Sequence, residues 1–342
     1  MKALITGISG QDGAWLAKSL IDSGYEVHGL VRRGSLPKTP RTDWLGVTEN
    51  ITFHQVELTE FSNVFEALKL IKPDYIYNLA AQSFVADSFK FPLLTQMINY
   101  NGYLHILESV RNLGIHCSIY QASTSEMFGT TKECILNEQS PLLPRSPYAI
   151  SKVAAHNIGQ NYREAYGMKI SNGILFNHES ELRGREFVTR KVTLQLAEVK
   201  VGKREIVQLG NLDSVRDWGY APDYVESMRL INEAPEPDDY VVATNQVNTI
   251  RDLVQIAGRF FEFDIVFENE GAHEKGYDRK TGAKIIEVNP RYFRPSDVTY
   301  LQGDYSKIKR LLGWEPSTTF EQMIDIMCSA DLERANAKSF IF

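Results

Sequence analysis

Residues 2–23 read KALITGISGQDGAWLAKSLIDS, and the architecture of the chain follows from them. Lys2–Thr6 predicts a short buried strand, and Ala14–Ser23 predicts a helix with one apolar side. Between them we expect a glycine turn. Its backbone amides, which no Cβ atoms cover, would bind a pyrophosphate. The residues expected around that group are Gly7, Gly10, Gln11, Asp12 and Gly13. A glycine triplet alone could be a tight turn, but its place after the first strand favours a dinucleotide site.

The end of the next predicted strand, Glu26–Val31, bears on which dinucleotide binds. An NAD site has Asp or Glu here to accept from the ribose 2′-hydroxyl, whereas arginine suits the 2′-phosphate of NADP. This chain continues with Arg32, Arg33, Gly34 and Ser35, and their guanidinium and hydroxyl groups suit a phosphate dianion. A solvated basic loop is the alternative. We predict NADP as the cofactor, with Arg32, Arg33 and Ser35 at its 2′-phosphate.

Strand and helix patterns alternate through the first half of the chain, which is typical of a doubly wound parallel sheet. After residue 31 we expect strands at 51–56, 75–79, 116–121 and 169–176, and helices at 61–71, 99–112 and 148–166. The prediction is a Rossmann-type α/β fold with a smaller C-terminal α/β domain. Residues 1–176 plus 215–248 are expected to bind NADP, and 177–214 plus 249–342 the substrate. Residues 268–284, rich in glycine and charge, are expected to be an exposed excursion.

Tyr148 and Lys152 are four residues apart on a predicted helix, so their side chains lie on one helix face. A phenol with a pKa of about 10 is a poor base at neutral pH, but a nearby ammonium favours the phenolate and lowers that pKa. The pair could therefore take a proton from a sugar hydroxyl while hydride leaves the same carbon. Thr124 could hold that hydroxyl, and Glu126 supplies a second base. A half-buried tyrosine beside a solvated lysine is the ordinary alternative.

The composition of the chain argues against several classes of protein, among them nucleic-acid-binding, membrane and disulfide-rich proteins. The 342 residues carry a net charge of −6 without long charged runs, which argues against nucleic acid as the main partner. The first residues already form strand, so no signal segment is expected, and charges interrupt every apolar run before membrane-spanning length. Cys117, Cys134 and Cys328 are scattered, as expected in a reducing cytoplasm without disulfides. The seven histidines show no metal-ligand spacing, and we predict no structural metal.

Several runs spread over nearly the whole chain resemble the GDP-mannose 4,6-dehydratase family, within the extended short-chain dehydrogenase/reductase superfamily. They are Gly7-Ile-Ser-Gly-Gln-Asp-Gly13, Tyr77-Asn-Leu-Ala-Ala-Gln-Ser83, Tyr120-Gln-Ala-Ser-Thr-Ser-Glu-Met-Phe-Gly129, Pro144-Arg-Ser-Pro-Tyr-Ala149, Gly173-Ile-Leu-Phe-Asn-His-Glu-Ser180, Glu186-Phe-Val-Thr-Arg-Lys191, Arg216-Asp-Trp-Gly219 and Pro290-Arg-Tyr-Phe-Arg-Pro295. The resemblance implies conversion of GDP-mannose to GDP-4-keto-6-deoxy-mannose plus water by an internal hydride cycle on NADP. It assigns the O4 proton to Tyr148 and the C5 proton to Glu126, with Thr124 and Lys152 completing the catalytic set.

The resemblance also implies binding roles. For the cofactor it adds Glu57, Leu58, Leu79, Ala81, Ser83, His178 and Arg183, with Tyr148 and Lys152 also on the cofactor side. For GDP-mannose it implies Ser83, Ser125, Glu126, Asn177, Lys191, Arg216 and Arg294, since planar arginine forks suit a diphosphate. Two alternatives stay open: His178 as a hydrogen-bonded structural histidine, and Arg216 as an ion-pair partner of Asp217 or Asp223.

The assembly and the reaction each have alternatives. We expect a homodimer or homotetramer, with dimer contacts through the helices near 93–111 and 148–166. A related NADP-dependent nucleotide-sugar reductase or epimerase, or a non-catalytic NADP-binding regulator, could share the fold. Glu126 favours the dehydratase, because reduction and epimerisation have less need of a base there. The presence of Thr124, Tyr148 and Lys152 together argues against a regulator.

Overall fold

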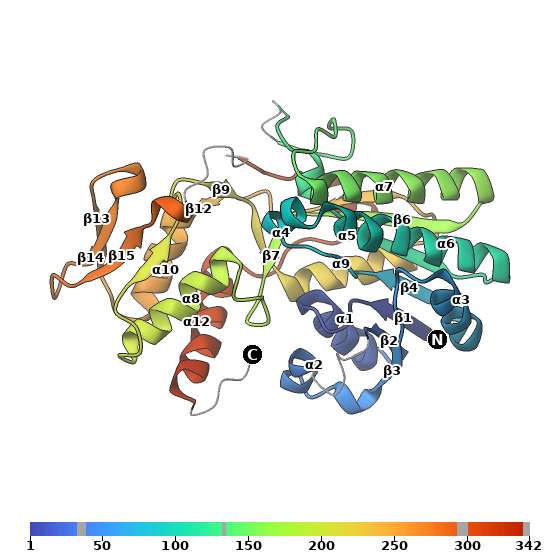
Figure 1. The fold of residues 1–342 in the computed structure, drawn as a ribbon, viewed down its shortest axis with the longest axis horizontal. Coiled ribbons are helices and arrows are strands. Elements are labelled where there is room, and N and C mark those ends of the chain that lie inside the picture. The colour runs from blue at the N-terminus through green and yellow to red at the C-terminus, as the bar shows by residue number, and fades with distance from the viewer. Residues whose placement is uncertain (33–38, 132–134, 293–299, 338–342) are drawn as a thin grey trace. The chain divides into compact units, whose positions relative to one another are not determined.

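The structure is a computed structural model that describes residues 1–32, 39–131, 135–292 and 300–337. The chain divides into two compact units (Figure 1). Unit 1 contains Met1–Phe176, Ala221–Ala243 and Gly303–Glu315, and unit 2 contains Asn177–Tyr220, Thr244–Gln302 and Pro316–Phe342. The expected boundaries differ at three places, since residues 215–220 and 244–248 belong to unit 2 and 303–315 to unit 1. Strand pairing accounts for the first difference, because residues 218–220 pair with 177–179.

Unit 1 is built on one sheet of seven strands in the order β11-β6-β5-β4-β1-β2-β3. Every neighbouring pair of these strands is parallel. Their bounds are β1 (Lys2–Thr6), β2 (Glu26–Val31), β3 (Ile51–Gln55), β4 (Tyr75–Asn78), β5 (Ser118–Thr124), β6 (Lys169–Leu175) and β11 (Asp239–Val242). The strand order reverses between β1 and β4, and open α/β sheets bind ligands outside the carboxyl ends of strands at such a point.

Apolar layers cover both faces of this sheet. Ala3 and Ile5 pack with one set of helices and Leu4 with the other, because successive side chains along a strand point to opposite faces. The first layer contains α1 (Gln11–Asp22), α9 (Ala221–Glu233) and α11 (Ser306–Leu312), and the second contains α3 (Phe61–Ile71), α6 (Gly102–Leu113) and α7 (Pro147–Tyr166). The predicted doubly wound Rossmann-type sheet is therefore confirmed (Figure 1).

Shorter helices complete unit 1. They are α2 (Pro40–Trp44), α4 (Val85–Lys90), α5 (Pro92–Gln96) and a π-helical turn at Met97–Asn101 that leads into α6. The long helix α7 starts at the N-cap Ser146, whose side chain accepts from the Ala149 amide, and it ends at Gly167 in the left-handed conformation. Both ends of α7 are thus specified by local residues, and the predicted helix 148–166 is confirmed.

Unit 2 is a smaller α/β assembly with its own apolar core. A four-stranded sheet runs in the order β13-β14-β15-β8. Its strands are β13 (Ile265–Glu268), β14 (Lys275–Asp278), β15 (Lys284–Val288) and β8 (Val207–Leu209), and its helices are α8 (Val188–Lys200), α10 (Ile250–Phe260) and α12 (Phe320–Asn336). Two short pairs, β7 (Asn177–Glu179) with β10 (Trp218–Tyr220) and β9 (Val215–Arg216) with β12 (Asn248–Thr249), complete the unit. Residues 268–284 are not the expected excursion, because β14 pairs on both sides within the sheet.

None of the helices in the described ranges combines the length and the apolar character that crossing a bilayer requires.

Candidate active site

The backbone of the glycine turn after β1 is closely packed against neighbouring backbone. A Cβ on Gly13 would lie 2.4 Å from the Gly7 carbonyl oxygen, and a Cβ on Gly7 would lie 2.8 Å from the Ala80 amide nitrogen. Gly7 also has a φ of +72°, which favours glycine. The turn closes with the Gly10 amide donating to Gly7 at 2.9 Å, and α1 begins at Gln11. A side chain at Gly7 or Gly13 would therefore collide with backbone, so these glycines allow the turn to lead directly into the N-terminus of α1.

The other expected cofactor residues in unit 1 follow the carboxyl ends of neighbouring parallel strands. Arg32 follows β2 and is exposed, whereas Glu57 and Leu58 follow β3 and are half-buried and buried. Leu79, Ala81 and Ser83 follow β4; the first two are half-buried and Ser83 is exposed. Parallel strands place their carboxyl ends at one edge of a sheet, so these residues lie along the same edge as the glycine turn. Arg33 and Ser35 fall outside the described residues.

Thr124 and Glu126 stand at the carboxyl end of β5. The Thr124 hydroxyl caps a short 3₁₀ turn, Ser125–Met127, by accepting from the Glu126 amide at 3.3 Å. Ser125 is buried, while Thr124 and Glu126 are half-buried. This cap places the two candidate catalytic residues two positions apart on one short turn at the carboxyl end of β5.

Tyr148 and Lys152 lie on the first turns of α7 and are both buried. Lys152 is only 3% exposed, its ammonium donates to the Ala122 carbonyl at 2.9 Å, and it lies 6.0 Å from the centre of the Tyr148 ring. Burial lowers the pKa of Lys152 to about 8, and the nearby charge of Asp12 partly opposes that shift. The alternative of a solvated lysine is therefore wrong. A cation held this close to a phenol favours the phenolate.

Two polar groups that support α7 were not foreseen from the sequence. Asn99, in the π-helical turn, donates to the Ser151 hydroxyl at 2.9 Å, and Ser151 donates to the Tyr148 carbonyl at 2.7 Å. These bonds orient the turn that carries Tyr148. A π-helical turn often marks a functional site, but no residue pattern predicted it here.

A second buried network lies one turn further along α7. The Gln160 amide nitrogen is 2.6 Å from Asp239 and 3.1 Å from Nε2 of His156, so it donates to both. His156 is therefore neutral with its proton on Nδ1, from which it donates to the Ser123 hydroxyl at 3.0 Å. Burial lowers the pKa of His156, which agrees with a neutral ring. The network anchors the strand that ends at Thr124.

Unit 2 contains three of the described residues expected on the GDP-sugar side. Asn177 lies on β7, Lys191 on α8 and Arg216 on β9. The Lys191 ammonium sits 3.9 Å from the centre of the Tyr292 ring, and burial lowers its pKa. Arg216 donates to the Val215 carbonyl at 2.8 Å. Arg294 falls outside the described residues.

Arg183, an expected cofactor residue of unit 2, is tied to its own unit. Its Nε lies 3.0 Å from the Glu179 carboxylate, and its guanidinium stacks on Phe187 at 3.6 Å from the ring centre. His178 is buried on β7. Both residues therefore have structural surroundings in unit 2, and the open alternative for His178 stays open.

The sheet order, the glycine turn and the buried tyrosine–lysine pair define a short-chain dehydrogenase/reductase type of enzyme. Solved structures agree: the chain is similar to RMD from Pseudomonas aeruginosa complexed with NADPH, at 20% identity, a TM-score of 0.77 and coverage of 97% and 99% of the two chains. It is also similar to UDP-glucose 4-epimerase of Thermus thermophilus in complex with NAD, at 25% identity, a TM-score of 0.78 and the same coverage. These similarities agree with the doubly wound fold described above.

The particular family follows from the sequence matches. The family described as GDP-mannose 4,6 dehydratase matches residues 4–327. The GDP-mannose 4,6 dehydratase of Drosophila melanogaster is 44% identical over 97% of this chain and 86% of its own length. The proteins of that name from Yersinia enterocolitica and Homo sapiens are 43% and 42% identical, over 99% and 97% of this chain and 96% and 91% of their own. The chain belongs to the GDP-mannose 4,6-dehydratase family, so the predicted family and its hydro-lyase class are confirmed.

Proposed function

We propose that this enzyme converts GDP-mannose to GDP-4-keto-6-deoxy-mannose and water, with NADP bound throughout the cycle. The observation that carries the proposal is the buried Tyr148–Lys152 pair on α7 in the same unit as Thr124 and Glu126 at the end of β5. Oxidation at C4 requires a base for the O4 proton, and dehydration across C5 and C6 requires a base for the C5 proton. Tyr148 and Glu126 are two such groups of different chemistry.

The residues present fit a dinucleotide cofactor. The glycine turn leads directly into α1, whose N-terminal amides suit a pyrophosphate, and Arg32 stands at the end of β2, where arginine suits the 2′-phosphate of NADP. When bound, NADP would supply a hydride acceptor for C4 of the hexose and a hydride donor for C6. The residues proposed to hold it are Gly7, Gly10, Gln11, Asp12, Gly13, Arg32, Arg33, Ser35, Glu57, Leu58, Leu79, Ala81, Ser83, Tyr148, Lys152, His178 and Arg183.

Tyr148 is proposed to remove the O4 proton. The Lys152 ammonium favours the phenolate that this step requires, and the Ala122 carbonyl holds that ammonium in place. Thr124 is proposed to orient the 4-hydroxyl through a hydrogen bond. These roles need the lysine to stay protonated at neutral pH, which a pKa of about 8 permits.

Glu126 is proposed to remove the C5 proton. A ketone at C4 acidifies that proton, and the hydroxyl at C6 then leaves as water. Glu126 is half-buried, and its backbone amide donates to the Thr124 hydroxyl that caps the turn. Simple alcohol oxidation needs no such group, and for this reason Glu126 favours dehydration over reduction or epimerisation.

The GDP part of the substrate is proposed to bind residues of unit 2. Lys191, Arg216 and Arg294 supply cations for a diphosphate, and Asn177 supplies an amide for a hydroxyl. Ser83, Ser125 and Glu126 are proposed to contact the hexose from unit 1.

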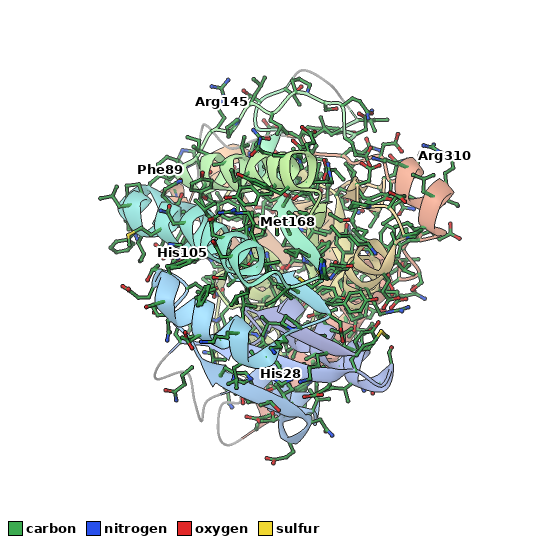
Figure 2. The ribbon with its side chains drawn as sticks, turned by 90° about the vertical axis from the view of Figure 1, so that its right-hand side faces the viewer. His28, Phe89, His105, Arg145, Met168 and Arg310 are labelled. Atoms are coloured by element: carbon green, nitrogen blue, oxygen red, sulfur yellow. The ribbon has the colours of Figure 1, made fainter. Side chains whose placement is uncertain are left out.

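A homo-oligomer, either a dimer or a tetramer, is proposed through the helices α4, α5 and α7. The described part of these helices and their junctions exposes large apolar side chains, and Figure 2 labels one of them, Phe89. They are Phe89, Phe91, Leu93, Leu94, Met97 and Ile150. Exposed apolar clusters of this kind mark protein interfaces. We also propose a cytoplasmic location, in keeping with the free thiols of Cys117 and Cys328.

The reaction is tested by incubating the purified protein with GDP-mannose in heavy water, without added reductant. The expected product has lost one water and carries deuterium at C5. Glu126→Gln should abolish this product, whereas Glu164→Gln, an exposed carboxylate on α7, should leave it unchanged. An unchanged sugar, together with turnover of another nucleotide-sugar, would overturn the substrate assignment.

A further inference from the structure

Three buried polar side chains connect the central strands of the unit 1 sheet. Thr6 ends β1, Asn78 ends β4 and Gln121 lies on β5, and they are between 0% and 3% exposed. The Thr6 hydroxyl donates to the Asn78 carbonyl oxygen at 2.7 Å. The Asn78 amide donates to the Gln121 carbonyl oxygen at 2.7 Å, and the Gln121 amide donates to the Ala122 backbone carbonyl at 3.1 Å. The bonds form one unbroken chain.

The direction of this chain is determined by its first member. The amides of Leu79 and Ala80 both donate to the Thr6 hydroxyl oxygen, at 3.1 and 3.0 Å. The single hydroxyl proton must then go to Asn78, so Asn78 presents its oxygen to Thr6 and its nitrogen to Gln121. The same reasoning fixes the amide of Gln121. Flipping either amide would leave buried donors facing donors.

The two ends of the chain lie at functional positions. At one end, the Ala122 carbonyl that accepts from Gln121 also accepts from the Lys152 ammonium at 2.9 Å. At the other end, Gly7 packs so tightly on Ala80 that a Cβ would lie 2.8 Å from its amide nitrogen. The chain therefore runs from the glycine turn to the lysine beside Tyr148.

We propose that Thr6, Asn78 and Gln121 form a positioning relay that orients the Ala122 carbonyl, fixes the Lys152 ammonium beside Tyr148, and ties that place to the glycine turn. This inference rests on the role proposed above for Lys152. None of the three side chains needs to touch substrate, since each acts through the next. The Ala122 carbonyl accepts a hydrogen bond from the Gln121 side-chain amide and therefore cannot rotate freely. The Lys152 ammonium, which donates to the same carbonyl, is thereby held in one position.

The relay is tested with two changes of Gln121 and one of Thr6. Gln121→Met keeps the size of the side chain and removes both hydrogen bonds. Gln121→Glu, buried and neutral, can accept from Asn78 and donate to the Ala122 carbonyl, so it keeps both bonds. In Gln121→Met the acidic limb of the kcat/KM profile should move upward by roughly half a pH unit or more, because the phenolate loses support, whereas Gln121→Glu should keep the wild-type limb. Thr6→Val should in addition weaken NADP binding several-fold, since it frees the Leu79 and Ala80 amides.

A matched control separates positioning from simple loss of stability. Asn232 is also buried, and its amide donates to the Ile76 carbonyl of β4 at 3.2 Å. Asn232→Leu should lower the melting temperature without moving the acidic limb. If folded Gln121→Met keeps the wild-type limb, the chain is only structural and the proposal is wrong. Should Gln121→Met fail to fold, Thr6→Val decides, because it removes the bond to Asn78 and the relay predicts the same upward shift.

A failure of the proposed function can be told apart from a failure of the relay. If the wild-type protein does not turn over GDP-mannose, the titration of Tyr148 is followed directly, by ultraviolet difference spectroscopy of tyrosinate against Tyr148→Phe. The relay predicts that this titration moves upward in Gln121→Met and stays in place in Gln121→Glu and Asn232→Leu. An identical titration in all of them would refute the relay whatever the substrate.

Discussion

Replacing Lys152 with methionine removes the cation beside Tyr148 and keeps most of the side-chain volume. The ammonium lies 6.0 Å from the centre of the tyrosine ring. At that separation and an effective dielectric constant of about 20, two unit charges interact by about 3 kcal/mol, which equals about 2 pH units of titration. The phenolate loses this support in Lys152→Met. The acidic limb of kcat/KM should therefore rise by about 2 pH units, a loss of roughly 100-fold at neutral pH.

The same change should make the folded protein more stable at neutral pH. Burial lowers the pKa of Lys152 to about 8 from an ordinary 10.5, so the unfolded chain binds more protons between those values. The free energy of unfolding therefore rises with pH between about 8 and 10.5. Below pH 8 the lysine is charged in both states, and its burial destabilises the folded protein by the full amount. Removing the ammonium relieves the penalty, less the lost bond to Ala122, a net gain of roughly 2 kcal/mol.

The assay combines a pH–rate profile with GDP-mannose and urea unfolding at pH 7, for wild type, Lys152→Met and Lys69→Met. Lys69 is an exposed lysine of α3, and its replacement should change neither measurement. A Lys152→Met variant with a raised acidic limb and a higher stability agrees with the reasoning. A variant with the wild-type acidic limb and lower stability would refute it, since Lys152 would then serve packing alone.

Three further outcomes follow from named contacts. Gly13→Ala places a Cβ 2.4 Å from the Gly7 oxygen, so the NADPH affinity should fall by roughly tenfold or more, about 1.4 kcal/mol. Fluorescence titration measures this affinity, and an unchanged value would contradict the proposed role of the glycine turn in cofactor binding. Burial lowers the pKa of His156, so the unfolded chain takes up its proton first as pH falls below 6.5; the melting temperature should drop through that range, and His156→Gln should flatten the drop. Asp331→Asn leaves the buried guanidinium groups of Arg190 and Arg334 without their shared carboxylate. Urea unfolding should show that the free energy of unfolding falls by about 3–5 kcal/mol, and a loss no larger than that of an exposed Asp→Asn substitution would count against the ion pair.

The residue patterns of short segments predicted several elements next to the edge of the sheet where the ligands are proposed to bind. The strands Lys2–Thr6 and Glu26–Val31 and the helix Phe61–Ile71 have the bounds that were predicted. Each is marked by a continuous apolar run or an apolar helix face, and each is ended by a glycine, proline or charged residue nearby. Residues 268–284 were misjudged because β14 is antiparallel to partners on both sides, and its glycine and charges hide a strand that exists only through that pairing.

The types and order of the functional groups could be predicted from the sequence alone: a glycine turn, the nearby Thr124 and Glu126, and the Tyr148–Lys152 pair, each after a strand or on a helix. That is so because a parallel sheet sends the carboxyl ends of its strands to one edge, whatever lies between them. The burial of Lys152, its hold on Ala122, and the links through Thr6, Asn78 and Gln121 join residues as much as 72 positions apart. Such contacts depend on which strands become neighbours and how tightly helices cover them, and no short stretch of sequence carries that information.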